Sequence, residues 1–195
     1  MKGKSGMRIT KDPEERKQEI LDTSMEIFCE KGYDKTSISD IAKKMGVAQG
    51  LCYRYFKSKE EIFNSAIEHY ADMQAAQMKK VLFDNSSSLK TKLKRKMNFI
   101  DFEKNDINYY KVFHGKDSEK IHNQLLMKVS EKMYPAVCNV LREEIEEGNI
   151  NLKFSDPETV ASFIVYGQFG ILIRTDLTNE EKEKRIYSFI ESLLY

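Results

Sequence analysis

The sequence predicts an all-α protein with a small N-terminal unit and a larger C-terminal one, and three observations lead to that prediction. The 195 residues include only three prolines and nine glycines, so few residues interrupt long helices. Apolar residues recur at three- and four-residue spacing, and no run shows the strict alternation of a half-buried strand. Hydrophobic residues make up 41% and charged residues 32%, which is typical of a soluble chain that buries a core.

The first helix is predicted to begin at Pro13 and to end before Gly32. Asp12 followed by a proline has the residue types of an N-cap and a first helical position. Glycine then ends the helix, because it adopts the left-handed conformation of a C-terminal cap without strain. The buried stripe of this helix is Ile20, Leu21, Ser24, Ile27 and Phe28.

Two short helices separated by Gly46 follow, and together they have the pattern of a helix-turn-helix. Ser37 and Asp40 have the spacing of a capping box, with Asp in place of the usual Glu. The second segment, residues 47–55, is too short to be stable as an isolated helix, so its neighbours must hold it. The buried face of the first segment is Ile38, Ile41, Ala42 and Met45.

A long helix is predicted from Lys59 to Phe83, because Ser58 and Glu61 repeat the capping-box spacing. Asn85 and the three serines after it are the clearest interruption. Further helical patterns cover residues 88–104, 106–114, 118–147, 157–175 and 179–194. The first of these carries a basic cluster, interpreted as a solvated face, with contact to an anionic ligand or DNA left open: Lys90, Lys92, Lys94, Arg95 and Lys96.

The second helix of the motif crowds rings and positive charges, which is unusual for a helix that only packs. A recognition helix must approach base edges in the major groove of DNA while its neighbours bind phosphates. Ala48 and Gly50 are small enough for close approach, and the Gln49 amide suits a base edge, most often adenine. Arg54 is left open between a base and a phosphate.

Phosphate contacts are predicted on both sides of the recognition segment. The hydroxyls of Tyr53 and Tyr55 can donate to phosphate oxygens while their rings brace the helix. Lys59 lies at a helix N-terminus, where backbone N–H groups and the helix dipole also favour an anion. Thr36 and Ser37 place hydroxyls and free N–H groups at another helix N-terminus.

Residues from about 14 to about 65 resemble the DNA-binding domain of the TetR family of bacterial transcriptional regulators. An Ile-Ala-x-x-x-Gly-Val run followed by Gly-x-x-Tyr-x-Tyr-Phe-x-x-Lys is a specific combination, whereas helix-turn-helix spacing alone is not. The residues that carry the resemblance are Ile20, Leu21, Phe28, Gly32, Tyr33, Thr36–Ile38, Asp40–Ala42, Gly46, Val47, Gly50, Tyr53–Glu61 and Phe63.

The resemblance implies an all-α homodimer that inserts the third helix of each subunit into the major groove of a palindromic operator in double-stranded DNA. The family contacts map onto Ala48, Gln49, Gly50, Tyr53, Tyr55 and Lys59, with the second-helix N-terminus at Thr36–Ile38. Two positions depart from the family pattern. Leu51 replaces the usual Ser or Thr and cannot hydrogen-bond, and it is expected to face outward. Cys52 replaces the usual Leu and, like Phe56, is expected to face the core.

The last two helical patterns are predicted to form the dimer interface. Two glycines three residues apart allow close helix approach, and pairing across a two-fold axis would form a four-helix bundle. The alternative, that both stripes pack only inside one subunit, is left open. The predicted interface residues are Phe163, Gly167, Gly170, Ile171, Ile186, Phe189, Ile190 and Leu193.

A small-molecule pocket in the C-terminal helices is implied by the resemblance. Rings and thioethers are frequent there, which favours an apolar or amphipathic ligand whose binding releases a repressor from DNA. Ordinary core packing is the alternative for each of these residues. The predicted ligand-binding residues are Phe99, Phe102, Tyr109, Tyr110, Phe113, Met127, Tyr134 and Tyr166.

Charge and cysteine usage agree with this reading. Residues 1–59 hold 13 Lys and Arg against nine Asp and Glu, whereas residues 60–195 hold 19 against 22, so the positive excess lies at the N-terminus. Cys29, Cys52 and Cys138 are scattered at apolar positions, which suits buried thiols in a reducing cytosol. No signal peptide or 18-residue apolar run is present, so a cytoplasmic location without membrane contact is expected.

The predicted organisation is a flexible basic arm (1–12), a helix-turn-helix DNA-binding domain (13–58), a connecting helix (59–83) and a ligand-binding and dimerisation domain (84–195). There is no nucleophile–base motif, phosphate loop, HExxH or metal-spaced cluster, so no enzyme, metal site or cofactor is predicted. A helical module that binds a ligand or a protein without reading DNA is the alternative function.

Overall fold

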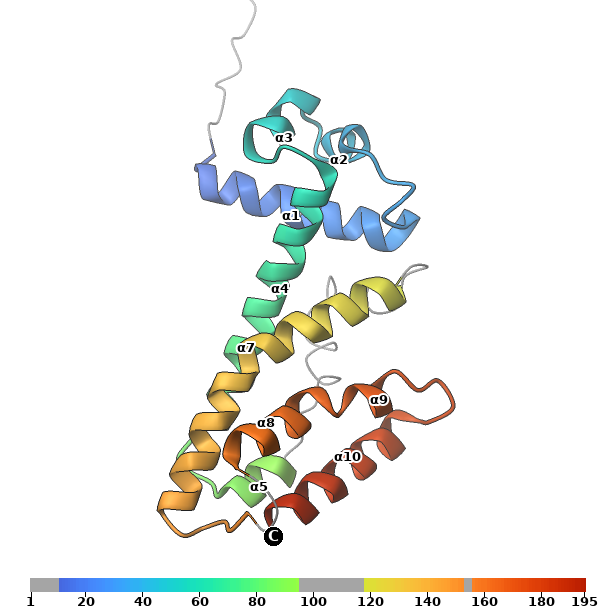
Figure 1. The fold of residues 1–195 in the computed structure, drawn as a ribbon. Coiled ribbons are helices and arrows are strands. Elements are labelled where there is room, and N and C mark those ends of the chain that lie inside the picture. Colours follow the sequence, from blue (N-terminus) through green and yellow to red (C-terminus); the bar gives the residue numbers. More distant parts are fainter. Residues whose placement is uncertain (1–10, 95–117, 153–155) are drawn as a thin grey trace, which may run out of the picture.

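The computed structural model describes residues 11–94, 118–152 and 156–195, and every regular element among them is a helix (Figure 1). The predicted all-α fold is therefore confirmed. The helices are α1 (Pro13–Lys31), α2 (Ile38–Lys44), α3 (Gln49–Tyr55), α4 (Lys59–Leu82), α5 (Leu89–Lys94), α7 (Ser118–Glu146), α8 (Pro157–Tyr166), α9 (Phe169–Leu172) and α10 (Asn179–Leu194).

The helix starts follow the local signals in the sequence. The Asp12 carboxylate accepts a hydrogen bond from the Glu14 N–H at 2.9 Å, so it caps α1 as predicted. Both predicted capping-box serines cap their helices. At α4 only half of the box forms, because the Glu61 carboxylate accepts from the Lys57 N–H at 2.6 Å instead of from the cap residue.

The N-terminal unit consists of α1, α2 and α3 around the first turns of α4 (Figure 1). Three rings join the end of α1 to α4. The ring centroid of Phe28 lies 5.4 Å from that of Tyr33 and 5.5 Å from that of Phe63, and the latter two are 4.8 Å apart. Tilted and edge-on pairs at these distances are favourable. The large fully buried side chains of this unit are Ile20, Met25, Phe28, Ile41, Phe56 and Ile62.

Helix α4 belongs to both ends of the molecule. Its first half packs against α1, and further along it runs beside α7 (Figure 1). Lys132 on α7 forms ion pairs with Glu68 and with Asp72 on α4, the latter at 2.7 Å. The predicted buried stripe of α4 is confirmed at Ile62, Phe63, Ala66, Ile67 and Tyr70.

The C-terminal helices are interrupted at two places, by a bend in α7 and by a break between α8 and α9. Helix α7 bends along its length (Figure 1), and it contains Pro135, which has no N–H to donate to the preceding turn. The prediction of a single helix over residues 157–175 is wrong, because α8 ends at Tyr166 and a separate short helix, α9, follows. At the break the Gln168 amide donates to the Ile164 carbonyl, and a side chain at Gly167 would meet the Phe163 carbonyl oxygen.

The basic cluster of residues 90–96 is not uniformly solvated. Lys92 is buried, and its ammonium donates to the Leu82 carbonyl at 2.8 Å, so it caps the C-terminus of α4. Lys90 pairs with Glu191 at 3.1 Å and lies over the Tyr195 ring. Residues 95 and 96 lie outside the described residues, as do residues 1–10 of the predicted arm and the predicted helix over 106–114.

Candidate nucleic-acid interface

The turn between α2 and α3 presents α3 outward from the N-terminal unit. Gly46 has a φ of 67°, in the left-handed region that glycine adopts without strain. The N–H groups of Gly46 and Val47 donate to the carbonyls of Lys43 and Ala42 at 3.1 and 3.0 Å, which closes the end of α2. The predicted helix-turn-helix is therefore present, with its second helix over Gln49–Tyr55.

Helix α3 has one buried face and one exposed face. Cys52 is fully buried, and Phe56, which caps the helix, is buried as well, as predicted. Ala48, Gln49 and Gly50 are exposed, and the side chain of Tyr53 is 52% exposed. A Cβ built at Gly50 meets nothing within 4 Å, so packing within this subunit does not require a glycine there.

The remaining predicted residues of α3 have intermediate or exposed positions. Arg54 is exposed in the last turn, where a cation is favourable to the helix dipole. Tyr55 packs partly against the core, so its ring braces the helix. Leu51, expected to face outward, is half-buried, and nothing in the structure explains its replacement of a Ser or Thr.

Thr36 does not present its hydroxyl to the surface. The residue is buried, its Oγ1 donates to the Gly32 carbonyl at 2.8 Å, and its N–H donates to the Tyr33 carbonyl at 3.2 Å. Both groups that were expected to contact DNA are thus used inside the turn between α1 and α2. We therefore remove Thr36 from the predicted DNA contacts and assign it to the geometry of this turn.

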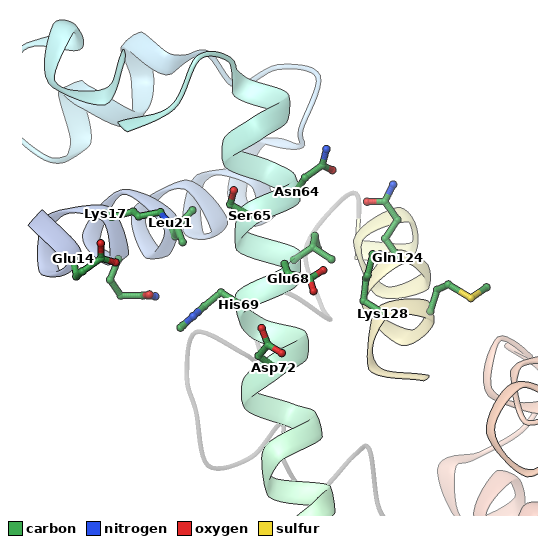
Figure 2. Close-up of a pocket in the computed structure, with 13 residues that line it drawn as sticks. Glu14, Lys17, Leu21, Asn64, Ser65, Glu68, His69, Asp72, Gln124 and Lys128 are labelled. Atoms are coloured by element: carbon green, nitrogen blue, oxygen red, sulfur yellow. The ribbon is translucent and has the colours of Figure 1, made fainter. Parts of the chain in front are cut away.

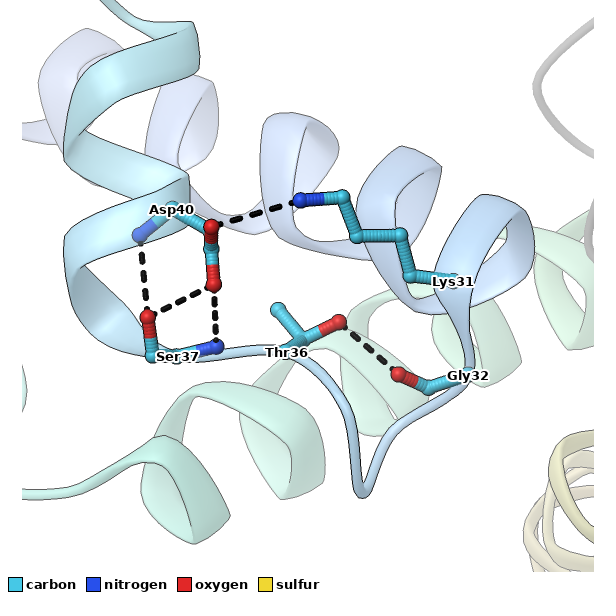
Figure 3. A network of polar contacts seen from close by, with 5 residues as sticks. All are labelled: Lys31, Gly32, Thr36, Ser37 and Asp40. Atoms are coloured by element: carbon cyan, nitrogen blue, oxygen red, sulfur yellow. Dashed lines mark hydrogen bonds and ion pairs between the residues drawn. The ribbon is translucent and has the colours of Figure 1, made fainter.

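Ser37 is exposed and takes part in a network that fixes the start of α2 (Figure 3). The Asp40 N–H donates to Ser37 Oγ at 3.1 Å, and the Ser37 N–H donates to the Asp40 carboxylate at 2.9 Å. Lys31, at the end of α1, pairs with the same carboxylate at 3.3 Å. Hydrogen bonds from Ser37, reinforced by Lys31, lower the pKa of Asp40 to about 2. The network joins α1 to the helix that carries the motif.

Lys59 is bound within the chain. Its ammonium donates to the Tyr33 carbonyl at 2.8 Å and lies 4.3 Å from the centroid of the Tyr33 ring. Tyr33 is the aromatic residue that directly follows Gly32. The partners are 26 positions apart, so no local pattern links them.

The cations of the motif fall into two groups. Lys44 pairs with Glu26 at 3.1 Å and with Glu30 at 3.0 Å, and Lys31 pairs with Asp40. No ion pair within the described residues involves the exposed residues Lys35, Lys43, Arg54 and Lys57. Positive charge that has no ion pair among the described residues therefore lies in the loop before α2, at the end of α2, at the end of α3 and in the loop after α3.

Comparisons with known proteins agree with this geometry. The profile described as "Bacterial regulatory proteins, tetR family" matches residues 20–66, from the middle of α1 into α4. The matched part of the chain is a TetR-family domain. A helix-turn-helix-type transcriptional regulator of Bacillus subtilis, YerO, is 40% identical over 67 residues, which are 34% of this chain and 23% of that protein. The negative transcriptional regulator IcaR of the icaADBC biofilm operon of Staphylococcus epidermidis is 36% identical over 53 residues, 27% of this chain and 29% of that protein.

The TetR-family fold extends beyond the matched N-terminal part. The crystal structure of a TetR-family protein from Mesorhizobium loti superposes with a TM-score of 0.66, covering 94% of this chain and 97% of the other at 18% identity. At that identity the likeness concerns the fold alone. In sequence, the alignments with YerO and IcaR span only about a quarter of the length of those proteins.

The predicted dimer interface lies on α8, α9 and α10, and part of it is exposed. The side chains of Phe163 and Phe189 are 58% and 48% exposed, and Gly167 and Gly170 are exposed as well. Ile171 is half-buried, and so are Ile186 and Leu193, which pack partly on the subunit's own core. Ile190 is only 4% exposed, so we remove it from the predicted interface. Ile173, which was not among the predicted interface residues, is 57% exposed.

The predicted ligand-binding residues do not form one pocket among the described residues. Tyr134 and Tyr166 have ring centroids 6.1 Å apart, whereas Met127 lines a separate cleft of about 870 Å³ between α1, α4 and α7 (Figure 2). Most residues that line this cleft are of polar or charged types: Glu14, Lys17, Gln18, Leu21, Asn64, Ser65, Ile67, Glu68, His69, Asp72, Gln124, Met127 and Lys128. The other five lie outside the described residues: Phe99, Phe102, Tyr109, Tyr110 and Phe113.

The described residues contain neither a membrane-spanning helix nor a metal site. No helix within residues 11–94, 118–152 and 156–195 is long and apolar enough to span a membrane. The same residues contain no group of three His, Cys, Asp or Glu side chains placed to hold a metal ion. All three cysteines are buried, as predicted, and none of them forms a disulfide.

Proposed function

We propose that this chain is a transcriptional regulator that binds double-stranded DNA by inserting α3 into the major groove. The observation that carries the proposal is the exposed N-terminal half of α3. Ala48, Gln49 and Gly50 are exposed to solvent, and a Cβ at Gly50 would meet no atom within 4 Å. A surface this small in side-chain volume suits close approach to base edges, and Gln49 supplies the amide that reads them.

The flanks of α3 supply the phosphate contacts in this proposal. Tyr53 and Arg54 are exposed on α3, and Ser37 is exposed at the start of α2. Tyr55 braces the helix, because it packs partly against the core, and its hydroxyl donates to a phosphate oxygen in this proposal. Contacts of this kind orient the protein on the duplex, whereas the side chains at the start of α3 carry the sequence preference.

The regulator acts as a homodimer in this proposal, with α8 and α10 of two subunits forming the contact. Phe163 and Phe189 are large apolar side chains exposed on neighbouring helices, and a two-fold axis would cover each with its counterpart. A symmetric dimer places two copies of α3 against two half-sites about 34 Å apart, so a palindromic operator is the matching target.

Repression released by a small molecule completes the proposal. Helix α4 contacts α1 in the N-terminal unit and α7 in the C-terminal part, so a ligand that shifts α7 against α4 also moves the recognition helix. IcaR, one of the relatives, is a negative regulator. The cleft between α1, α4 and α7 is lined by charged and polar side chains together with Leu21, Ile67 and Met127, so it suits an amphipathic effector.

The test is a single substitution in α3. Gly50→Leu adds a side chain into open space, so the fold should keep its thermal stability, while DNA binding should weaken more than about tenfold. Wild-type protein is first used to select bound fragments from genomic DNA, and both proteins are then titrated on the best fragment. No sequence-preferring, salt-sensitive binding by the wild type would favour the alternative, a helical module that binds a ligand or protein without reading DNA.

A further inference from the structure

Lys59 is the first residue of α4, and its side chain reaches back to the turn between α1 and α2. The ammonium donates to the Tyr33 carbonyl at 2.8 Å and lies over the ring of the same residue, 4.3 Å from its centroid. One side chain thus uses both a charge-assisted hydrogen bond and a cation–π contact on a single partner. The residue is only partly exposed.

Tyr33 is held in the N-terminal unit by ring contacts and by a main-chain hydrogen bond. Its ring lies 5.4 Å from that of Phe28 and 4.8 Å from that of Phe63, centroid to centroid. Its carbonyl also accepts the Thr36 N–H at 3.2 Å, one residue before the capping box of α2. Holding this carbonyl therefore holds the place where α2 begins, and α2 carries the turn that presents α3.

We propose that Lys59 is a positioning residue for DNA recognition: it ties the start of α4 to Tyr33 and so sets the presentation of α2 and α3, in place of contacting a phosphate itself. This inference rests on the proposed DNA-binding function. Leaving Tyr33 for a phosphate would cost Lys59 both of its contacts, whereas Arg54 and Lys57 have no ion pair within the described part of the chain.

The discriminating variant is Lys59→Met, which keeps most of the side-chain volume over the ring and removes the ammonium. A phosphate contact and a positioning contact predict different salt dependences, because each lost phosphate contact lowers the slope of log K against log salt by about 0.9. For a positioning residue, affinity should fall about tenfold at every salt concentration while the slope stays within about 0.5 of the wild-type slope.

A second readout needs no DNA. Amide hydrogen exchange of residues 34–40 should be about tenfold faster in Lys59→Met than in the wild type, because the turn loses its tie to α4. Lys57→Met, two positions earlier and exposed, is the matched control and should leave this exchange unchanged. If the wild type binds no DNA, the proposed function fails, yet the exchange measurement still tests the tie.

A slope lowered by about 1.8, one contact in each subunit of a dimer, together with unchanged exchange would overturn the proposal and make Lys59 a phosphate contact. Should Lys59→Met fail to fold, Tyr33→Leu provides the second variant. It removes the ring but keeps the carbonyl and the lysine, so it should weaken binding without lowering the slope. A lowered slope in Tyr33→Leu would contradict the positioning role as well.

Discussion

Arg54 should make a phosphate contact whose loss is visible in the salt dependence of DNA binding. It is exposed at the end of α3, and no ion pair within the described residues involves it. Arg54→Gln removes the charge in both subunits of a dimer, so the slope of log K against log salt should fall by about 1.8. When the salt concentration rises from about 50 to about 200 mM, the binding constant of the variant should therefore fall about 12-fold less than that of the wild type.

The assay is a fluorescence anisotropy titration of a selected genomic fragment at several salt concentrations. Lys44→Met is the matched control, because Lys44 is already paired with Glu26 and Glu30 on α1 and should leave the slope nearly unchanged. An unchanged slope for Arg54→Gln would assign Arg54 to a base instead of a phosphate. Equal losses of slope in both variants would refute the division of the cations into paired and unpaired groups.

Other predictions concern the dimer, the capping network and the buried lysine. Phe189→Glu should give a folded monomer by analytical ultracentrifugation, and a dimer that persists would remove the exposed α10 face from the interface. The folded-state pKa of Asp40, about 2, lies below the value near 3.9 of an unfolded chain, so its stabilisation is present above about pH 4 and is lost as the pH falls through about 2. The difference in urea midpoint between wild type and Asp40→Asn should therefore narrow over that range, and a constant difference would contradict the assignment. Lys92→Met should lower the free energy of unfolding by about 2 kcal/mol, because it leaves the Leu82 carbonyl without its charged donor, whereas Lys90→Met should cost less than about 0.5 kcal/mol.

The parts of this fold that could be predicted from the sequence depend on short separations along the chain. Asp12, Ser37 and Ser58 were identified as helix starts because a capping side chain and its N–H partner are two or three residues apart. The buried face of α4 was predicted for the same reason, since the helical repeat decides which residues share a face. Burial that depends on distant partners, such as that of Thr36 or Ile190, leaves no such pattern.

In the candidate site, too, side chains whose surroundings depend on nearby residues were predictable, whereas those with distant partners were not. The outward face of α3 was predicted because Cys52 and Phe56 are apolar at helical spacing and the residues between them are not. Lys59 was predicted to contact a phosphate because a lysine at a helix N-terminus beside DNA-facing residues has that sequence pattern. Its partner within the chain, Tyr33, is identified only when α1, α4 and the turn between α1 and α2 are placed together. A lysine in such a motif should therefore be assigned to phosphate only after its neighbours in space, including main-chain carbonyls, have been examined.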